Sequence, residues 1–362
     1  MPTATKAIVP VPVRWLFGVR YPPMAQRWQL CGRRRAYLSG VSNCNIFPMK
    51  AIYFNEYGPA SVLQYGEQPT PKPKASQVLV RVRASSVNPV DWKVREGAMK
   101  LMMSPSFPKL TGRDVAGEVT AVGDDVVRFA PGDRVYGMVD GVGGANAEYA
   151  VLEEMHAAFI PDNLSFEQAA AVPLVATTAL QALRDHAPVL SGDRVLVNGA
   201  SGGVGSLAIQ LAWALGAGEV VGTCGPDNVE LVRSLGASQV YNYEEHDFTK
   251  DLSRYDVVFD AAGKSSFGES KACLRNNGRY VTTQPDPKAI AVAAVQAAFS
   301  NKKQAAFMAS NSGSDLALIG AWLKAGTIHP VIDRTFPLAE TRAAQEYGEQ
   351  GESKGKIVLT VE

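Results

Sequence analysis

The sequence predicts an α/β protein of two domains, one rich in short strands and the other built around a parallel sheet with helices on both faces. Strand-like segments follow one another between about residues 50 and 152, with no helical pattern between them. From about residue 173 strands and helices alternate, and a glycine-rich turn joins the first of these strands to the helix after it. The length of 362 residues suits two domains, at roughly 100–200 residues each.

The first region is predicted to form a compact β-rich domain. Its apolar, partly alternating segments are residues 78–83, 115–122, 134–138 and 148–152. Turn-forming residues separate them, at 123–125, 130–133 and 141–144. Many short strands without intervening helices favour a β-rich layer structure.

The second region predicts a parallel sheet covered on both faces. Strands are expected at 194–198, 219–223, 240–241, 256–260 and 279–283. Between the first two, Val204, Ala208, Leu211 and Leu215 recur at spacings of four, three and four, which predicts an amphipathic helix. A second helix is expected at 229–235, and the chain ends in a strand at 356–361. Short connections between alternating strands and helices are typical of parallel sheets.

The sharpest motif is the sequence VLVNGASGGVG at 195–205, which ends a predicted strand and opens a predicted helix. Glycine lets the main chain approach a pyrophosphate, and the start of a helix offers unpaired N–H groups and partial positive charge. We therefore predict that main-chain groups of Ser201, Gly202, Gly203 and Val204 hold a dinucleotide pyrophosphate. Gly205 is expected to let the helix lie close to the sheet. A tight strand–helix turn without a ligand is the alternative.

The next strand end favours NADPH over NADH. Dinucleotide folds often carry an acid there, which binds the ribose 2′-hydroxyl and would repel a 2′-phosphate. Here Thr223, Cys224 and Gly225 end the strand without an acid, although Asp227 is near and no Arg or Lys follows until Arg233. We expect Thr223 and Gly225 to line the cofactor path. Tyr243 is a candidate for the adenosine end or simply a packed strand-end residue.

Composition excludes several classes of function. Hydrophobic residues make up 46% and charged residues 20%, as in globular proteins with large cores. No apolar run approaches the roughly 20 residues of a membrane-spanning helix. The net charge of +1 does not indicate a basic field for nucleic acid. The cysteines form no C-x-x-C pair, so neither a disulfide framework nor a clustered zinc site is indicated.

The first 48 residues differ in charge from the rest. They hold seven Lys and Arg and no Asp or Glu, so the net +1 of the chain leaves −6 for residues 49–362. Prolines interrupt any regular period there. A basic leader without acids is typical of an organellar transit peptide, although this one is poor in serine. The alternative is an upstream extension before a fold that begins at Met49. Under both interpretations we expect 1–48 to be poorly ordered.

Further motifs resemble one family. They are VNPVDWK at 87–93, GRDVAG at 112–117, GDRVYG at 132–137, LVATTAL at 174–180, PVIDRTF at 330–336 and GKIVL at 355–359. Together with the glycine turn they resemble the medium-chain dehydrogenase/reductase superfamily, most closely its zinc-free quinone oxidoreductase branch with zeta-crystallin and the alkenal reductases. The resemblance implies a GroES-like substrate domain at 49–172 plus 309–362 and a Rossmann domain inserted at 173–308. The active cleft would lie between them.

Zinc is not expected. The zinc-dependent members of this superfamily place a Cys where this chain has Asn88 and a His where it has Arg113, and a third ligand near Pro173 or Leu174. This is no usable set of zinc ligands. Without a metal to stabilise an alkoxide, the easier reaction is hydride transfer to an acceptor that delocalises charge, such as a quinone or an α,β-unsaturated carbonyl. Hydrogen-bond donors can hold the oxyanion that develops.

The resemblance also implies roles for individual residues, each with a structural alternative. Asn88 would line the pocket near the nicotinamide and donate its amide to a substrate oxygen, or it is a turn residue before Pro89. Lys93 would act in the cleft and contact the cofactor, or it is a solvated lysine. Tyr53 would orient substrate or relay a proton, or it is a packed strand residue. Further cofactor contacts are expected at Thr177, Gly263, Thr283 and Phe307, of which Thr177 is alternatively a helix-start residue and Phe307 a core residue.

The function that follows is an NADPH-dependent, metal-free reductase of quinones or conjugated enals and enones. The alternatives are an alkenal/enone double-bond reductase with no quinone role, and a weakly catalytic, crystallin-like nucleotide-binding protein. A zinc-free alcohol dehydrogenase activity is a third. The family implies a homodimer, and the net −6 of residues 49–362 argues against RNA unless the basic leader is retained. We expect a cytoplasmic protein, or a mitochondrial or plastid one if 1–48 is a transit peptide.

Overall fold

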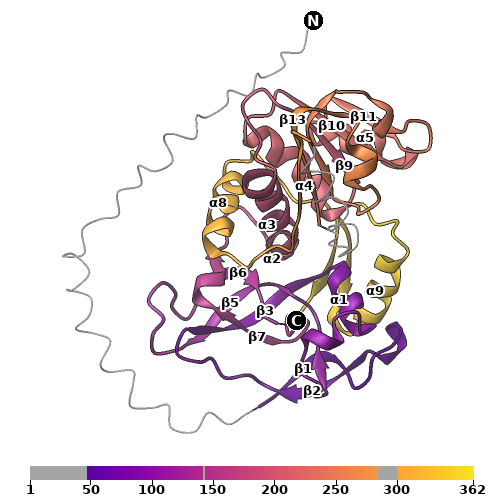
Figure 1. Ribbon diagram of the computed structural model, residues 1–362. Helices are drawn as coiled ribbons and strands as arrows, with labels where there is room; N and C mark the ends of the chain where they lie inside the picture. The colour runs from indigo at the N-terminus through magenta and orange to yellow at the C-terminus, as the bar shows by residue number, and fades with distance from the viewer. Residues whose placement is uncertain (1–46, 142, 284–299) are drawn as a thin grey trace, which may run out of the picture. The chain divides into compact units, whose positions relative to one another are not determined.

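The computed structural model describes residues 47–141, 143–283 and 300–362 (Figure 1). All the helices and strands described belong to the unit that runs from Pro48 to Glu362. The predicted leader, up to residue 46, lies outside the described residues, as do Cys31 and Cys44. The strand β1 spans Pro48–Phe54 and contains Met49, where the fold was expected to begin.

The β-rich part is built on a seven-stranded sheet in the order β15-β16-β3-β5-β6-β8, with β7 also paired to β3. The pairs among β3, β5, β6, β7 and β8 are antiparallel. Along β3 buried and more exposed residues alternate over its first half, which is the period of two that the sequence predicted. The strands are β3 (Gln77–Val87), β5 (Asp114–Val122), β6 (Arg134–Met138), β7 (Tyr149–Glu153), β8 (Ala157–Phe159), β15 (Ile332–Pro337) and β16 (Lys356–Thr360). A smaller sheet has the order β2-β1-β4, with β2 at Gln64–Pro69 and β4 at Lys109–Leu110.

The second sheet has six strands, all parallel, in the order β11-β10-β9-β12-β13-β14. Numbered from its own first strand, this is the order 3-2-1-4-5-6 of the doubly wound dinucleotide-binding fold, with a switch point between β9 and β12. The strands are β9 (Arg194–Asn198), β10 (Glu219–Cys224), β11 (Gln239–Asn242), β12 (Tyr255–Asp260), β13 (Leu274–Thr282) and β14 (Lys303–Ala306).

Both faces of the parallel sheet are buried. Val195 and Val197 of β9 belong to one hydrophobic cluster, and Leu196 between them belongs to another. Successive side chains of a strand point to opposite faces, so the short apolar run VLV fills two cores at once. The helices are α1 (Pro89–Arg95), α2 (Phe166–Ala170), α3 (Pro173–Gln181), α4 (Gly203–Ala214), α5 (Val229–Ser234), α6 (Phe267–Ser270), α8 (Gly313–Lys324) and α9 (Thr341–Glu349).

The last strand returns the end of the chain to its beginning. β16 pairs antiparallel with β3, with Ile357 opposite Val87. An isolated parallel bridge joins Gly355 to Gly202 in the glycine-rich turn. The segment before β16 thus touches both the β-rich sheet and the parallel sheet. The C-terminal part of the chain is drawn in yellow in Figure 1.

The predicted α/β class is confirmed, and the predicted strands and helices are found within a few residues of their expected bounds. The expectation of strands alone between residues 50 and 152 is wrong, because the short helix α1 (Pro89–Arg95) lies between β3 and β5. The strand β14 was also not predicted, because its sequence KQAA shows neither an apolar run nor alternation. Pairing with β13 forms this edge strand, which is a tertiary effect. Among the described residues, no helix combines the length and the apolar character that crossing a bilayer requires.

Candidate functional site

The glycine-rich turn connects β9 to α4. Gly199 follows the strand with φ +82, a conformation that glycine adopts without strain. A Cβ on Gly205 would stand 2.1 Å from the carbonyl oxygen of Gly199, so only glycine lets the helix start lie on the turn. α4 begins at Gly203, with Gly202 as the N-cap residue and no side-chain cap hydrogen bond. The first N–H groups of a helix have no intrahelical acceptor, so this end can receive an anion.

The open side of the turn lies at Gly202. The nearest atom that its Cβ would meet is the Gly199 carbonyl oxygen, at 3.6 Å. By contrast, a Cβ on Gly203 would come within 2.9 Å of the Lys356 side chain. The free space at Gly202 and the uncapped N–H groups at the start of α4 together suit the binding of a pyrophosphate.

The side chain of Thr223 holds the glycine-rich turn by hydrogen bonds. Its Oγ1 accepts a hydrogen bond from the Gly199 N–H at 3.2 Å and lies 2.5 Å from Asn198 Oδ1, to which it donates. Asn198 in turn donates to Asp260 at the end of β12. Thr223 is almost fully buried. The structure therefore uses its side chain to fix the shape of the turn.

The remaining predicted residues at the strand ends lie on the same edge of the sheet. Gly263, with φ +66, follows β12, and Thr283 follows β13. The Gly225 main chain follows β10 and Tyr243 follows β11, with the Tyr243 N–H bonded to the Cys224 carbonyl oxygen. The carboxyl ends of parallel strands meet at one edge, which is where ligands bind in this fold.

A buried polar cluster lies beside the turn, on the β-rich side. Lys356, the first residue of β16, donates to Asn88 Oδ1 at 2.5 Å and to the Val87 carbonyl oxygen at 2.8 Å, and its Nζ is 3.5 Å from Asp114 Oδ2. Asn88 Nδ2 donates to the same Asp114 oxygen at 2.8 Å. Asp114 also accepts from the Leu174 N–H at the start of α3. The cluster thus joins strands and helices from four parts of the chain.

Asn88 is fully buried in this cluster, and its amide is largely used by the protein. Its oxygen accepts from Lys356, and one Nδ2 proton goes to Asp114. Its main-chain N–H donates to Asp91, which lies in the first turn of α1. The expected donation to a substrate oxygen therefore depends on the second Nδ2 proton. The three charged partners of Asn88 were not predicted as site residues, although all three lie within quoted motifs.

Burial shifts the ionisation of this cluster. The pKa of Asp91 is raised from 3.8 to about 7, mainly because burial disfavours its charge, with Asp114 adding repulsion and Lys356 and Arg113 opposing the shift. The pKa of Lys356 is lowered, again chiefly by burial, although Asp114 and Asp91 favour its charged form. Asp91 Oδ1 has no hydrogen-bond partner, which suits a protonated carboxyl.

We expect Asp91→Asn to remove a pH dependence of stability. Between about pH 4 and pH 7 the folded wild type keeps a proton on Asp91 that the unfolded chain has lost, so its unfolding free energy falls as pH rises. Asparagine keeps the acceptor for the Asn88 N–H and does not titrate. Urea unfolding at several pH values measures the unfolding free energy of both proteins. Between about pH 4 and pH 7, the difference between the variant and the wild type should change in favour of the variant by on the order of 4 kcal/mol. Asp162→Asn, at a side chain 96% exposed, is the control; equal slopes in all three proteins would contradict the expectation.

Arg113 places a cation next to this cluster. Its Nη1 donates to the Gly141 carbonyl oxygen and its Nη2 to Asn311 Oδ1, each at 3.2 Å. Its Nε is buried and has no partner. The guanidinium therefore links the β-rich sheet to the segment that follows β14. The sequence showed Arg113 only as a replacement for a zinc ligand; that it supplies positive charge near Asp91 is visible only in the structure.

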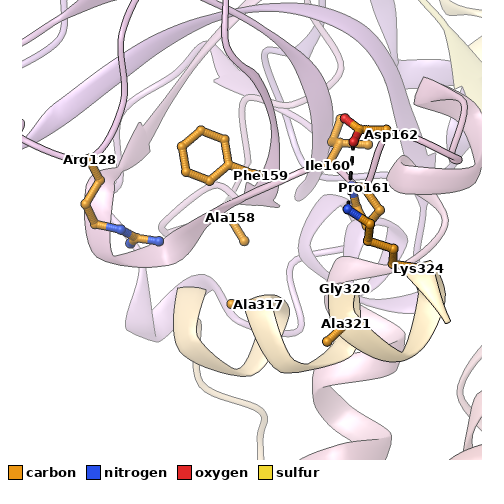
Figure 2. Close-up of a pocket in the computed structure, with 10 residues that line it drawn as sticks. All are labelled: Arg128, Ala158, Phe159, Ile160, Pro161, Asp162, Ala317, Gly320, Ala321 and Lys324. Atoms are coloured by element: carbon orange, nitrogen blue, oxygen red, sulfur yellow. Dashed lines mark ion pairs between the residues drawn. The ribbon is translucent and has the colours of Figure 1, made fainter. Parts of the chain in front are cut away.

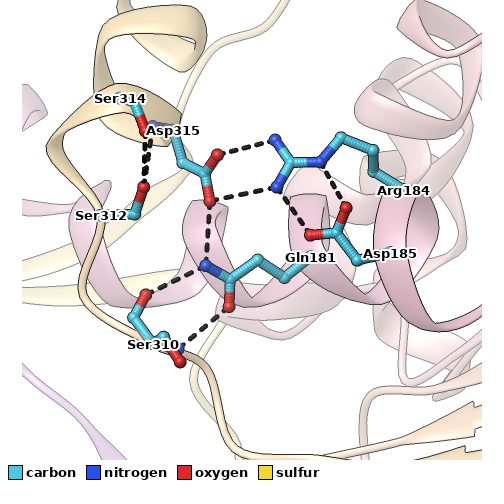
Figure 3. A network of polar contacts seen from close by, with 7 residues as sticks. All are labelled: Gln181, Arg184, Asp185, Ser310, Ser312, Ser314 and Asp315. Atoms are coloured by element: carbon cyan, nitrogen blue, oxygen red, sulfur yellow. Dashed lines mark hydrogen bonds and ion pairs between the residues drawn. The ribbon is translucent and has the colours of Figure 1, made fainter.

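Thr177 lies in the middle of α3, three residues after Leu174, whose N–H donates to Asp114. Thr177 is fully buried, and its Oγ1 has no hydrogen-bond partner, which marks a polar atom available to a ligand. One turn later, Gln181 exchanges two hydrogen bonds with Ser310 and donates to Asp315 of α8, which also pairs with Arg184 (Figure 3). This network fixes the segment after β14 against α3.

Phe307 begins that segment and packs inward. It is 7% exposed, and its ring stacks on His186 with centroids 4.2 Å apart. Its N–H donates to the Thr282 carbonyl oxygen at the carboxyl edge of the sheet. The predicted nicotinamide contact and the core alternative are both compatible with this place.

Tyr53 and Lys93 lie in the β-rich part. Tyr53 is on β1, and its hydroxyl lies 3.2 Å from the position of a Cβ on Gly66 in the neighbouring strand. The ring therefore lies over β2, and the structure does not bring its hydroxyl into the hydrogen bonds of the Asn88 cluster. Lys93 is partly buried in the last turn of α1, five residues after Asn88.

A surface pocket with a volume of about 340 Å³ lies beside α8 (Figure 2). It is lined by Arg128, Ala158, Phe159, Ile160, Pro161, Asp162, Ala317, Gly320, Ala321 and Lys324. None of these belongs to the glycine turn or to the Asn88 cluster, so the pocket is separate from the candidate site. Within the described ranges, no three His, Cys, Asp or Glu side chains are grouped as a metal site would require.

Comparison with known proteins agrees with this geometry. Residues 74–162 match the model of the alcohol dehydrogenase GroES-like domain, and residues 235–359 match that of the zinc-binding dehydrogenase family. The chloroplast envelope quinone oxidoreductase homolog of Arabidopsis thaliana is 36% identical over 323 residues, which cover 86% of this chain and 98% of that protein. The chloroplastic NADPH-dependent alkenal/one oxidoreductase of the same plant is 34% identical over 322 residues, covering 86% and 79%.

A solved structure extends the likeness to three dimensions. The quinone oxidoreductase from Coxiella burnetii superposes with a TM-score of 0.80 at 34% identity, covering 87% of this chain and all of that one. Relatives of this identity that are covered over nearly their whole length share the two-domain fold and the nicotinamide-dependent redox chemistry of the family. The chain is therefore an oxidoreductase that belongs to the zinc-free quinone oxidoreductase branch of the medium-chain dehydrogenase/reductase superfamily.

Proposed function

We propose that the protein uses NADPH to reduce quinones or α,β-unsaturated carbonyl compounds without a metal ion. The observation that carries the proposal is the glycine turn, whose uncapped helix start and open side at Gly202 lie beside the buried Lys356. The relatives named as quinone oxidoreductase and as alkenal/one oxidoreductase support the two substrate classes. The absence of an acid at the end of β10 supports NADPH.

The residues have separable tasks in such a reaction. The main chain at 201–204 would bind the pyrophosphate, and the unpartnered Thr177 hydroxyl would bind near the nicotinamide. When bound, the cofactor supplies a hydride from its nicotinamide ring. Thr223 and the Gly355 N–H both hold the turn by hydrogen bonds, so the bound cofactor would be kept in one orientation, which lowers the entropic cost of reaction.

The chain must also stabilise the negative charge that develops on the acceptor oxygen. Arg113 acts electrostatically on Asp91 of the Asn88 cluster, and its guanidinium donates hydrogen bonds to Gly141 and Asn311. We propose that Arg113 and the second amide proton of Asn88 bind the substrate oxygen. A donor in such a position is typically worth about 3–4 kcal/mol of transition-state stabilisation.

Two other properties belong to this proposal. A cytoplasmic location is the simplest expectation, and the chloroplastic names of two relatives support the organellar alternative for a basic leader. A homodimer is expected from the family. The weakly catalytic, crystallin-like alternative keeps the same turn and differs in turnover. The alkenal/enone reductase without a quinone role also keeps the turn and differs in the substrates that it accepts.

The proposal predicts steady-state NADPH oxidation with a quinone, an enone or both, and the product separates the classes: a hydroquinone or a saturated carbonyl. Arg113→Gln should lower kcat/KM roughly 100-fold or more while the Kd for NADPH changes little, and Arg113→Lys should recover part of the loss. Lys324→Gln, at an exposed residue of the separate pocket, should behave as wild type. No turnover of either acceptor, under conditions where NADPH binds, would leave the crystallin-like alternative.

A further inference from the structure

The loop that should receive the adenosine ribose contains no basic residue of its own. After β10 the chain reads Gly225-Pro226-Asp227-Asn228, and the next cation, Arg233, is ion-paired with Glu230. An NADPH-binding protein needs positive charge or donors here, because the 2′-phosphate of this cofactor is an anion with strong acceptor oxygens. The local sequence therefore leaves the 2′-phosphate without a counter-charge.

The tertiary structure supplies a cation from the other end of the chain. Lys354 is exposed and lies just before β16, and its Nζ donates to the carbonyl oxygen of Asp227 at 3.3 Å. The donor and acceptor are separated by 127 residues in the sequence. An exposed ammonium has three donors, and only one of them is used in this bond.

Gly355 explains why Lys354 reaches this place. It has φ +88, and a Cβ there would lie 2.4 Å from the carbonyl oxygen of Val331. Its N–H donates to the Ser201 carbonyl oxygen at 2.9 Å, which fixes the segment along the glycine turn. Lys356, directly after Gly355, enters the buried Asn88 cluster. Lys354, directly before Gly355, extends to the loop after β10. The two lysines thus flank the turn at opposite ends of the expected cofactor path.

The surroundings of Lys354 fit a phosphorylated ribose. The hydroxyl of Tyr243 lies 3.1 Å from the position of a Cβ on Gly225, and the ring is 62% exposed. The Oδ1 of Asn228 is buried without a partner and can accept a hydrogen bond from a ribose or base. The exposed carboxylate of Asp227 opposes an anion, so a cation at this loop is needed to offset it.

We propose that Lys354, supplied by the segment before the C-terminal strand, binds the 2′-phosphate and makes the protein selective for NADPH over NADH. The proposal rests on the function proposed above, since it assigns one residue to the cofactor preference of that same site. Lys354 takes the role that a basic residue next to the second strand has in other dinucleotide folds.

The test measures nucleotide affinity without turnover. Dissociation constants for NADPH, NADH, 2′,5′-ADP and 5′-AMP would be determined by calorimetry for the wild type and for Lys354→Gln, Lys354→Arg and Lys324→Gln. Lys354→Gln should raise the dissociation constants for NADPH and 2′,5′-ADP about tenfold, the typical effect of losing one charge-assisted hydrogen bond. The dissociation constants for NADH and 5′-AMP should change by less than about twofold. Lys354→Arg should keep most of the preference, and Lys324→Gln all of it. The wild-type preference should also fall with added salt.

Each part of the hypothesis has its own contrary result. If Lys354→Gln weakens the binding of all four nucleotides equally, or of none of them, Lys354 does not recognise the 2′-phosphate and the inference is wrong. If the wild type prefers NADH, the NADPH assignment itself is wrong. If the wild type binds no nucleotide, the function proposed above fails, whatever the variants do.

Discussion

Gly202→Ala is expected to cost about 100-fold in nucleotide affinity while leaving the fold intact. Gly202 has φ −78 and ψ 175, which alanine adopts freely. The protein has room for the Cβ, whose nearest neighbour would be the Gly199 oxygen at 3.6 Å. A methyl group there would instead occupy the space next to the uncapped helix start, where close approach of the pyrophosphate requires glycine. The measurements are the Kd for NADPH and the thermal midpoint of unfolding.

Gly205→Ala is the matched comparison for Gly202→Ala, because it adds a methyl group to the same turn at a position where the protein itself leaves no space. Its Cβ would lie 2.1 Å from the Gly199 oxygen, so the main chain must shift. We expect a loss of about 1–3 kcal/mol in unfolding free energy, as for other overpacked sites, together with weaker binding. The two variants therefore differ in stability. Wild-type affinity for NADPH in Gly202→Ala would show that this side of the turn does not face the cofactor.

Lys356→Met should destabilise the protein by about 3–5 kcal/mol, the usual cost of removing one partner from a buried ion pair. Methionine fills a similar volume but leaves the buried Asp114 without its cation and the Asn88 oxygen without its donor. Urea unfolding at pH 7 measures the loss. Lys324→Met, at a side chain 68% exposed, should change the unfolding free energy by less than about 0.5 kcal/mol.

A second substitution distinguishes the buried charge from the lost packing. In the double variant Lys356→Met with Asp114→Asn, the uncompensated carboxylate is removed, so part of the stability should return. If the double variant is as unstable as the sum of the single ones, the pairing of Lys356 with Asp114 is not the source of the effect. A single variant with wild-type stability would contradict the buried pair altogether.

The fold could be predicted from the sequence because its signals are local. The apolar run at 195–197, the glycines at 199–205 and the amphipathic helix after them are contiguous, and each follows from the conformational freedom of glycine or from helical and strand periodicity. The edge strand β14 was missed because its residues carry no such signal.

The candidate site was predictable only in part. The pyrophosphate turn and the missing acid after β10 are contiguous in the sequence, and the resemblance added Asn88 and Thr177. Lys356 was not found as a partner of Asn88, because it lies 268 residues away in the sequence and no local pattern reports such a contact. In the sequence, Arg113 appeared only as a residue that replaces a zinc ligand, whereas in the structure it is a cation that acts on Asp91.

The sequence by itself determined the alternating strands and helices and the glycine turn, because each depends on residue types at short spacing. The tertiary structure alone decided which charges meet. Pairing of β16 with β3 brings the end of the chain to the turn, and the pivot at Gly355 sends Lys356 into the buried cluster and Lys354 to the adenosine end. Electrostatic interactions depend on distance in space, and only the folded chain sets that distance.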